Sequence, residues 1–189
     1  LKLSFEDKSE LNSAFTNLKN DHIQIVQNLF GKSDAESLLK EIECLFKELY
    51  HILTDNSNTD FDFKYDQVVS FGEIFSTKIV STYLNYVQYE NQWLDIRKVF
   101  ITDETYREAK IDWNTTKDKA SQVFNFNTQR VYLTQGFIGS NSKGYTTTLG
   151  REGSDFTAAV LANVLDAEKV VVWKDVDGIL TGNPSHIQN

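Results

Sequence analysis

The sequence predicts an α/β protein whose first half is helical and whose second half combines strands with helices. Apolar residues recur at intervals of three and four through residues 9–53, which is the spacing of one helix face. Residues 130–134 (Arg-Val-Tyr-Leu-Thr) and 169–173 (Lys-Val-Val-Val-Trp) are rich in β-branched residues and uninterrupted, which is typical of buried strands. A glycine-rich loop and a helical run separate these two segments, so we expect a βαβ unit with a right-handed crossover.

The helical half divides into three helices. Residues 9–30 form the first, because their apolar positions share one face and Gly31 follows where a glycine commonly ends a helix. A capping-box pattern (Ser-Asp-Ala-Glu) begins the second helix, residues 33–53, and the short connection predicts an antiparallel pair. After a polar loop at residues 54–62, a third helix is expected over residues 67–84.

The second half is expected to hold shorter elements. In chain order these are a strand (92–96), an irregular stretch (103–118), a brief helix (119–124), a strand (130–134), a loop (135–155), a helix (154–165), a strand (169–173) and a loop (174–184). Helix 154–165 should turn Phe156, Ala159, Val160 and Val164 inward. Both loops follow the carboxyl end of a strand, where α/β sheets bind ligands, so we expect them to face one cleft. The chain is thus divided into a helical subregion, residues 1–66, and an α/β core, residues 67–189, of one partial domain.

Composition narrows the range of functions. The formal charge is −8 with no offsetting basic patch, which argues against a nucleic-acid surface. No apolar run reaches the roughly 18 residues that would cross a membrane. The single cysteine, Cys44, rules out a disulfide framework and favours a cytoplasmic protein, and its helical context predicts a buried side chain. His22, His51 and His186 lack metal-ligand spacing, so no protein metal site is expected and the histidines should be structural or exposed.

The most informative segment is residues 146–155 (Thr-Thr-Thr-Leu-Gly-Arg-Glu-Gly-Ser-Asp), a polar turn that opens directly into a helix. Helix starts present unpaired N–H groups and a partial positive charge, which suit anionic ligands. Arg151 adds a planar group that can hold a carboxylate or phosphate through two hydrogen bonds. In the alternative reading, the glycines only make the turn, and Ser154 or Asp155 only caps the helix. Residue types alone leave both readings open.

Three segments taken in order resemble the aspartate kinase family. They are residues 69–76 (Val-Ser-Phe-Gly-Glu-Ile-Phe-Ser), residues 134–155, which run from Thr-Gln-Gly-Phe-Ile-Gly-Ser to Gly-Arg-Glu-Gly-Ser-Asp, and residues 172–184, which contain Lys-Asp-Val-Asp-Gly and Asn-Pro. The likeness covers roughly residues 69–184. It implies the amino-acid-kinase fold, an α/β three-layer αβα sandwich with a mainly parallel sheet, here incomplete and with a helical insertion in its first half.

The resemblance implies ATP-dependent phosphorylation of the side-chain carboxylate of L-aspartate to 4-phospho-L-aspartate, the first step of lysine, threonine and methionine biosynthesis. ATP and Mg²⁺ would be the cofactors, L-aspartate and ATP the binding partners, and the full-length protein a cytoplasmic homo-oligomer. Other kinases of the same fold, acting on glutamate, acetylglutamate or UMP, are the first alternative. A truncated domain that binds ligand without catalysis is the second.

The substrate residues follow from the same resemblance. Arg151 would bind the substrate α-carboxylate and Glu73 its ammonium group, while Ser154 and neighbouring N–H groups, with Gly153, would hold the reacting carboxylate. Asp155 would be the catalytic aspartate, orienting a phosphate-binding lysine or the metal. Without the resemblance, Glu73 would be a solvent-facing helix residue and Arg151 a surface ion pair.

The nucleotide would contact Lys174, Asp175, Gly178 and Leu180, which match the family's nucleotide loop in position. Lys174 stands where the family often has threonine, and a plain surface lysine is its alternative. Nothing before Leu3 resembles the family's Lys-x-Gly-Gly-Thr-Ser loop, and nothing after residue 184 resembles its regulatory region. We therefore expect this segment alone to be catalytically inactive.

Overall fold

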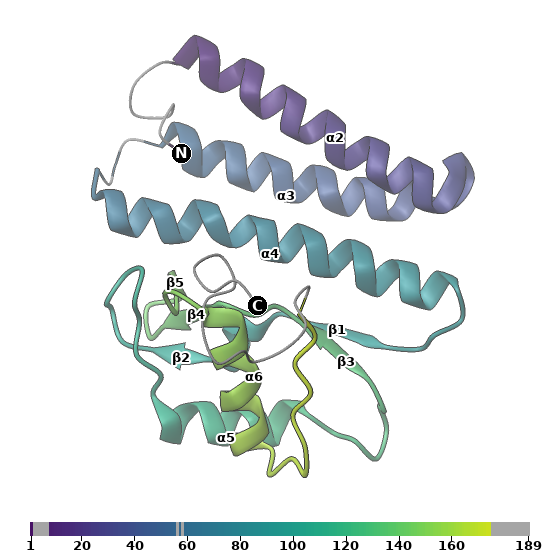
Figure 1. The fold of residues 1–189 in the computed structure, drawn as a ribbon. Helices are drawn as coiled ribbons and strands as arrows, with labels where there is room; N and C mark the ends of the chain where they lie inside the picture. Colours follow the sequence, from purple (N-terminus) through teal and green to yellow (C-terminus); the bar gives the residue numbers. More distant parts are fainter. Residues whose placement is uncertain (2–7, 56, 58, 175–189) are drawn as a thin grey trace, which may run out of the picture.

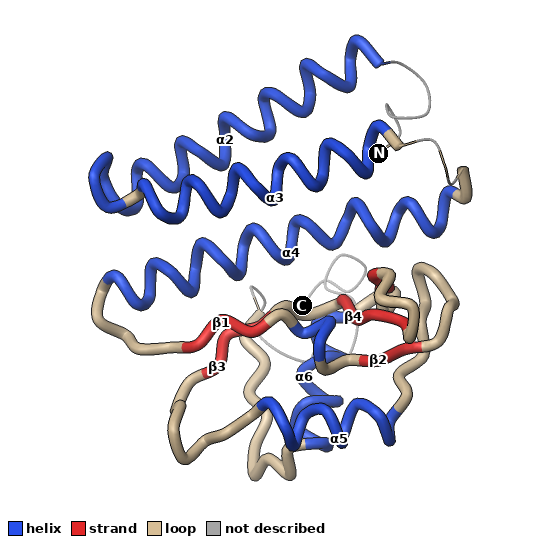
Figure 2. The backbone as a smooth tube through the Cα atoms, turned by 180° about the vertical axis from the view of Figure 1, so that it is seen from behind, coloured by secondary structure: helices blue, strands red, loops and turns tan. Residues whose placement is uncertain are grey.

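The computed structural model describes residues 1, 8–55, 57 and 59–174, and its elements lie in three layers (Figure 1). Three long helices, α2 (Lys8–Asp34), α3 (Glu36–Thr54) and α4 (Phe61–Tyr86), form one outer layer. Short strands form the middle layer, and α5 (Trp113–Val123) and α6 (Gly153–Val164) lie on the opposite face. The view from behind shows the same order (Figure 2). This arrangement confirms the expected partial αβα sandwich.

The first two helices are antiparallel, as predicted, and the chain reverses near Gly31. Gly31 has φ 74° and ψ 174°, a backbone conformation that residues with a Cβ rarely adopt. The predicted capping box is wrong in position, because Ala35 occupies the N-cap of α3 and makes no side-chain cap hydrogen bond. Glu36 instead accepts an ion-pair contact of 2.7 Å from Lys40, one turn later in the same helix.

Helix α4 is longer than predicted and lies between the other two long helices and the sheet. It begins at Phe61 because the Asp60 side chain accepts the N–H of Phe63 at 2.8 Å, an N-cap that the sequence analysis overlooked. Phe75 on this helix packs with α2 and α3, whereas Ile74 packs with the sheet. The helix continues without a break across residues 66 and 67. The division of the chain into residues 1–66 and 67–189 stays a prediction.

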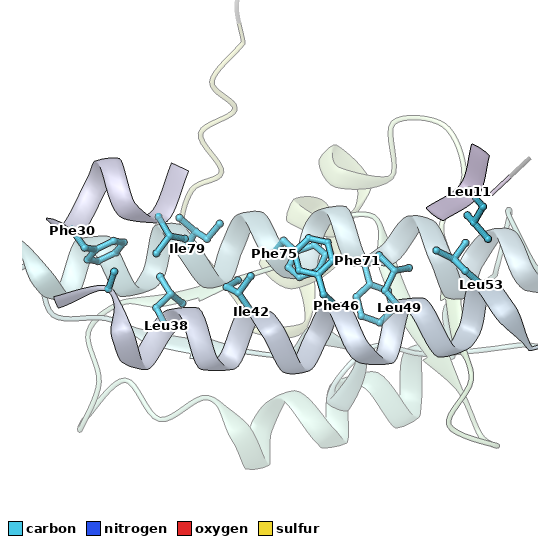
Figure 3. Packing of buried hydrophobic residues seen from close by; sticks show 12 residues of the cluster. Leu11, Phe30, Leu38, Ile42, Phe46, Leu49, Leu53, Phe71, Phe75 and Ile79 are labelled. Atoms are coloured by element: carbon cyan, nitrogen blue, oxygen red, sulfur yellow. The ribbon is translucent and has the colours of Figure 1, made fainter. Parts of the chain in front are cut away.

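Leucine, isoleucine and phenylalanine side chains fill the space between the three helices (Figure 3). The ring of Phe46 stacks on that of Phe75 with centroids 4.4 Å apart, and Phe15 and His22 approach Phe46 edge-on at 5.6 and 5.4 Å. His22 is therefore a structural residue, as predicted. Cys44 is exposed rather than buried, because the buried face of α3 follows the helical spacing of Leu38, Ile42, Phe46, Leu49 and Leu53.

The strands form one two-stranded and one three-stranded sheet. Strand β1 (Gln92–Leu94) pairs parallel with β3 (Tyr132–Thr134), with Trp93 opposite Leu133. Strand β2 (Ile101–Thr102) pairs parallel with β4 (Ile138–Asn141), which pairs antiparallel with β5 (Thr146–Thr148). A 3₁₀ turn (Ile96–Lys98) follows β1. Strands β1 and β3 confirm two predictions, whereas the β4–β5 hairpin lies in a segment that was expected to be a loop.

Helix α5 begins six residues earlier than predicted. The Asp112 side chain accepts the N–H of Thr115 at 3.1 Å and so caps the first turn. Helix α6 matches its predicted range, but its buried face consists of Gly153, Thr157, Val160 and Val164. Phe156 and Ala159 are exposed instead, which corrects the predicted inward face.

Residues 169–173 do not form the predicted strand. Val170, Val171 and Val172 are about half exposed, and Trp173 is 90% exposed, so it is neither core nor cleft wall. A β-branched segment becomes a buried strand only when a neighbour pairs with its N–H and C=O groups. Among the described residues no neighbour does so, and the parallel pairs are β1–β3 and β2–β4 instead. Among all the residues that the structure describes, no helix has the length and apolarity needed to cross a membrane.

Candidate functional site

The beginning and the end of the predicted loop 135–155 meet at the start of α6. A Cβ atom on Gly136 would lie 2.9 Å from Cα, Cβ and Oγ of Ser154, and one on Gly153 would lie 2.6 Å from the Phe137 ring. Only glycine permits such close approach. The Phe137 N–H also donates to the Thr157 hydroxyl at 2.9 Å. The segment after β3 and the first turn of α6 therefore form one packed unit.

The start of α6 has the geometry of an anion site. Its N-cap residue is Glu152, in a left-handed conformation with φ 56°, and it makes no side-chain cap hydrogen bond. Ser154 and Asp155 lie in the first turn rather than at the cap, so the reading in which either merely caps the helix is wrong. A helix start without a capping side chain directs N–H groups and a partial positive charge at whatever lies in front of it.

Asp155 lies beside a lysine from the end of the described chain. The Lys174 Nζ atom is 2.7 Å from Asp155 Oδ2 and 3.8 Å from Glu152 Oε2, and all three side chains are partly exposed. The structure thus brings together two residues that the sequence assigned to different loops, at the ends of the two segments expected to share a cleft. Asp175, Gly178 and Leu180 lie outside the described residues.

Arg151 stands at the edge of a cleft of about 560 Å³. The cleft is lined by the first turns of α4, by residues 105–108, by Phe137 and by the segment from Thr148 to Arg151. The Arg151 side chain is 95% exposed, and its ion-pair contact with Glu152 measures 3.9 Å. A contact of that length between exposed groups contributes little energy, so the guanidinium can reorient toward a ligand.

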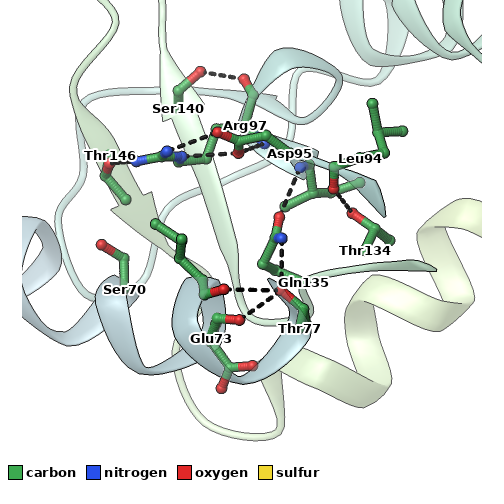
Figure 4. A network of polar contacts seen from close by, with 12 residues as sticks. Ser70, Glu73, Thr77, Leu94, Asp95, Arg97, Thr134, Gln135, Ser140 and Thr146 are labelled. Carbon is green, nitrogen blue, oxygen red and sulfur yellow. Dashed lines mark hydrogen bonds and ion pairs between the residues drawn. The ribbon is translucent and has the colours of Figure 1, made fainter. Parts of the chain in front are cut away.

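Glu73 lies on α4, and its side chain extends away from the neighbouring Thr77 and Gln135 (Figure 4). It is half-buried, and its carboxylate accepts no hydrogen bond from the described residues. Burial alone raises its pKa above the usual value. Glu73 is not among the residues that line the cleft beside Arg151, so the structure does not bring these two predicted substrate residues into one cavity.

Asp66 is a site residue that the sequence analysis missed. It is fully buried, its Oδ2 accepts the N–H groups of Arg107 and Thr148 at 2.9 and 2.8 Å, and its Oδ1 accepts the Thr148 hydroxyl at 2.8 Å. Burial raises the pKa of Asp66, and these hydrogen bonds oppose the shift. Arg107 and Thr148 belong to two neighbouring segments that line the cleft, and Asp66 ties both segments to α4. Asp66 lies one residue before the predicted helix of residues 67–84, and the sequence carried no signal for its role.

Comparisons with known proteins show the family to which the chain belongs. Residues 7–189 match the Amino acid kinase family. The chain is 43% identical to lysine-sensitive aspartokinase 3 of Escherichia coli over 154 residues, 81% of this chain and 33% of that protein. It is 34% identical to the chloroplastic aspartokinase 1 of Arabidopsis thaliana over 173 residues, 89% of this chain and 30% of that protein.

A solved structure extends the likeness to three dimensions. The crystal structure of E. coli aspartokinase III in complex with aspartate and ADP superposes with a TM-score of 0.85 at 33% identity. The superposition covers 95% of this chain and 40% of that chain. The chain thus spans about a third of the length of the curated relatives named above. With nearly all of its residues matched, the chain belongs to the amino acid kinase family and has aspartokinases among its relatives.

Proposed function

We propose that this chain is part of an aspartate kinase, which transfers the terminal phosphoryl group of ATP to the side-chain carboxylate of L-aspartate. The product is 4-phospho-L-aspartate, the entry to lysine, threonine and methionine biosynthesis. The observation that carries the proposal is the start of α6, where Ser154, the Asp155–Lys174 pair and the exposed Arg151 adjoin N–H groups that no side chain caps. Relatives named as aspartokinases, one of them solved with aspartate and ADP, support it.

The charged groups of L-aspartate match the charged side chains of the proposed site. Arg151 is suited to the α-carboxylate because its guanidinium can form two parallel charged hydrogen bonds. Glu73 supplies the counter-charge for the ammonium group, because its half-buried carboxylate accepts no hydrogen bond from the residues that the structure describes. Ser154 and the N–H groups of the first turn of α6 hold the reacting carboxylate. Gly153 contributes by permitting close backbone approach, since its own N–H donates to the Gly150 carbonyl at 3.1 Å. This carboxylate is already ionised at neutral pH, so Asp155 acts by orienting charge rather than by removing a proton.

Phosphoryl transfer depends mainly on positioning and on neutralising negative charge. Lys174, held at 2.7 Å by Asp155, is placed to offset charge on the ATP phosphates. Within the described residues no group of three acidic, histidine or cysteine side chains could hold a metal by itself. Mg²⁺ does not need a group of three such side chains, because it keeps several waters and binds through one or two carboxylates together with substrate phosphates. Asp175, Gly178 and Leu180 complete the proposed nucleotide contacts.

Replacing Arg151 by alanine should weaken L-aspartate binding to the chain at least tenfold, because a charged hydrogen bond contributes about 1.5–3 kcal/mol. Isothermal titration calorimetry measures the change. The free energy of unfolding should stay within about 0.5 kcal/mol of the unmodified chain, since the side chain is 95% exposed. Arg130→Ala removes an equal charge from an exposed position elsewhere and should leave the affinity unchanged.

The same titration distinguishes aspartate from the substrates of other kinases of this fold. Tighter binding of glutamate, acetylglutamate or UMP than of L-aspartate would assign the chain to another member of the family. An L-aspartate affinity that does not respond to Arg151→Ala would contradict the proposed role of the arginine.

The affinity for L-aspartate should fall as the pH is lowered through the raised pKa of Glu73. Only the ionised carboxylate attracts the ammonium group, and burial shifts its protonation to a higher pH than for an exposed glutamate. Glu73→Gln keeps the shape, removes the charge and should flatten this pH dependence while weakening binding at neutral pH. Titrations at a series of pH values test this, and the same slope in both proteins would rule out Glu73 as the ammonium partner.

A further inference from the structure

A buried glutamine connects three elements next to the proposed substrate site (Figure 4). Gln135 has no exposed surface, and both ends of its amide are used. Its Oε1 accepts the N–H of Ile96 at 2.9 Å, and its Nε2 donates to the Thr77 hydroxyl at 2.8 Å. A buried amide that is hydrogen-bonded at both its oxygen and its nitrogen holds its neighbours in one arrangement, because a displacement leaves polar groups without these partners.

Thr77 carries this restraint to Glu73. The Thr77 hydroxyl donates to the backbone carbonyl of Glu73 at 2.7 Å and accepts from Gln135 and from the Trp93 indole N–H, the latter at 3.1 Å. Glu73 lies one helical turn before Thr77 on α4. The amide of Gln135 is therefore bonded to the turn of α4 that presents the Glu73 carboxylate.

On its other side Gln135 is joined to the start of α6. The next residue, Gly136, approaches Ser154 so closely that an added Cβ would lie 2.9 Å from the Ser154 backbone. The residue after that, Phe137, donates its N–H to Thr157 of α6 at 2.9 Å. A displacement of Gln135 would therefore move the first turn of α6 relative to α4, and with it the spacing between Ser154 and Glu73.

We propose that Gln135 is a positioning residue that sets the separation between Glu73 and the first turn of α6, and so sets the length of amino-acid side chain the site accepts. This inference rests on the proposed function, in which the two points bind opposite ends of L-aspartate. Glutamate carries the same charged groups but is one methylene longer, so a fixed separation discriminates between the two. Apolar contacts alone discriminate one methylene by only about 10–200-fold. The spacing of the charged contacts therefore adds to the discrimination between aspartate and glutamate.

The test compares variants by calorimetry with L-aspartate and L-glutamate as the two ligands. Gln135→Leu keeps the approximate volume and removes both hydrogen bonds; it should weaken L-aspartate binding about tenfold, or about 1.4 kcal/mol. The preference for aspartate over glutamate should shrink with it. Thr77→Val should have a similar effect and Thr77→Ser almost none, because serine keeps the hydroxyl. The double variant Gln135→Leu with Thr77→Val should lose less than the sum of the two single changes.

Asn91 provides a matched control. It is also a buried amide that joins α4 to the segment around β1, with its Nδ2 donating to the Ser81 carbonyl at 3.1 Å. Its contacts reach Ser81 and Asn85 in the last turns of α4, eight or more residues beyond Glu73, so Asn91→Ala should lower stability without changing the aspartate-to-glutamate ratio. An unchanged ratio in Gln135→Leu would overturn the proposal. If Gln135→Leu does not fold, Gln135→Glu, which keeps the bond to Ile96 but loses the donor to Thr77, takes its place.

A ligand-free measurement separates this inference from the proposed function. Backbone amide NMR shifts of residues 153–157 should change in Gln135→Leu and in Thr77→Val, and stay constant in Asn91→Ala. If the unmodified chain binds no aspartate, the proposed function fails, whereas unchanged shifts at residues 153–157 in the Gln135 and Thr77 variants overturn the positioning role. The two failures thus have different signatures.

Discussion

Replacing Asp66 by alanine is expected to lower the free energy of unfolding by about 3 kcal/mol, because it leaves the N–H groups of Thr148 and Arg107 without their acceptor. It should also loosen the two segments around Arg107 and Thr148 that line the cleft beside Arg151. Equilibrium urea unfolding at neutral pH measures the change in stability. The effect should be large for a single polar residue, because a donor stripped of its partner in the interior loses its hydration as well.

Asp62→Ala is the matched control for this prediction. Asp62 lies on the same face of α4 and also contacts Arg107, but through an ion pair of 3.0 Å in which both side chains are about half exposed. Such a pair contributes about 0–1 kcal/mol. Equal losses of stability in the two variants would contradict the role assigned to Asp66.

The pH dependence gives a second control. Because burial raises the pKa of Asp66 above 3.8, the folded chain holds this proton more tightly than the unfolded chain. The stability that this group contributes is present below pH 3.8 and is lost as the pH rises through the folded pKa. Asp66→Asn cannot titrate, so its stability should not show this loss.

The second large effect is expected from Phe46→Ala, at about 3–5 kcal/mol of unfolding free energy. The ring is 1% exposed, stacks on Phe75 and contacts residues of α2, so its removal opens a cavity where all three long helices meet (Figure 3). Urea unfolding followed by far-ultraviolet circular dichroism reports on these helices directly.

Phe156→Ala makes the same chemical change at a position that is 40% exposed. Phe156→Ala should lower the free energy of unfolding much less than Phe46→Ala, because less apolar surface returns to water and no closed cavity forms. A larger loss from Phe156 than from Phe46 would show that the buried face of α6 has been misplaced.

The long helices were predictable because their signal is local and repeated. The apolar spacing of α3 persists over nineteen residues, and a few irregular positions do not obscure it. Their starts were less predictable, since Asp60 and Asp112 act as caps and the apparent capping box does not. Several polar residues precede each helix, and only the folded backbone decides which of them faces the first N–H groups.

Strands were harder to predict because their stability depends on partners far along the chain. The most β-like segment, residues 169–173, pairs with no strand among the described residues. Strand β2 has two residues, too few for any alternation to be visible. Strand β5 consists of three threonines and belongs to a hairpin whose turn contains Gly144 at φ 82°. Threonine is β-branched and favours strands, but this segment was predicted to be part of a polar loop.

The candidate site divides in the same way. Arg151, Ser154 and Asp155 are neighbours in the sequence, so their common position at a helix start could be predicted from the turn alone. Asp66 and Gln135 could not, because their partners lie 82 and 58 residues away. Nothing in a single sequence indicates that a particular carboxylate or amide will find such partners.

The three threonines of β5 carry a further consequence. All three are buried, and each hydroxyl has a different partner: Arg97 for Thr146, Thr102 for Thr147 and Asp66 for Thr148. Because the three side chains are identical, a shift of β5 by one residue would change its apolar packing very little. The three polar partners fix the register of β5, which the repeated sequence alone does not specify. They fix how much chain remains to reach the start of α6, and therefore where Arg151 stands.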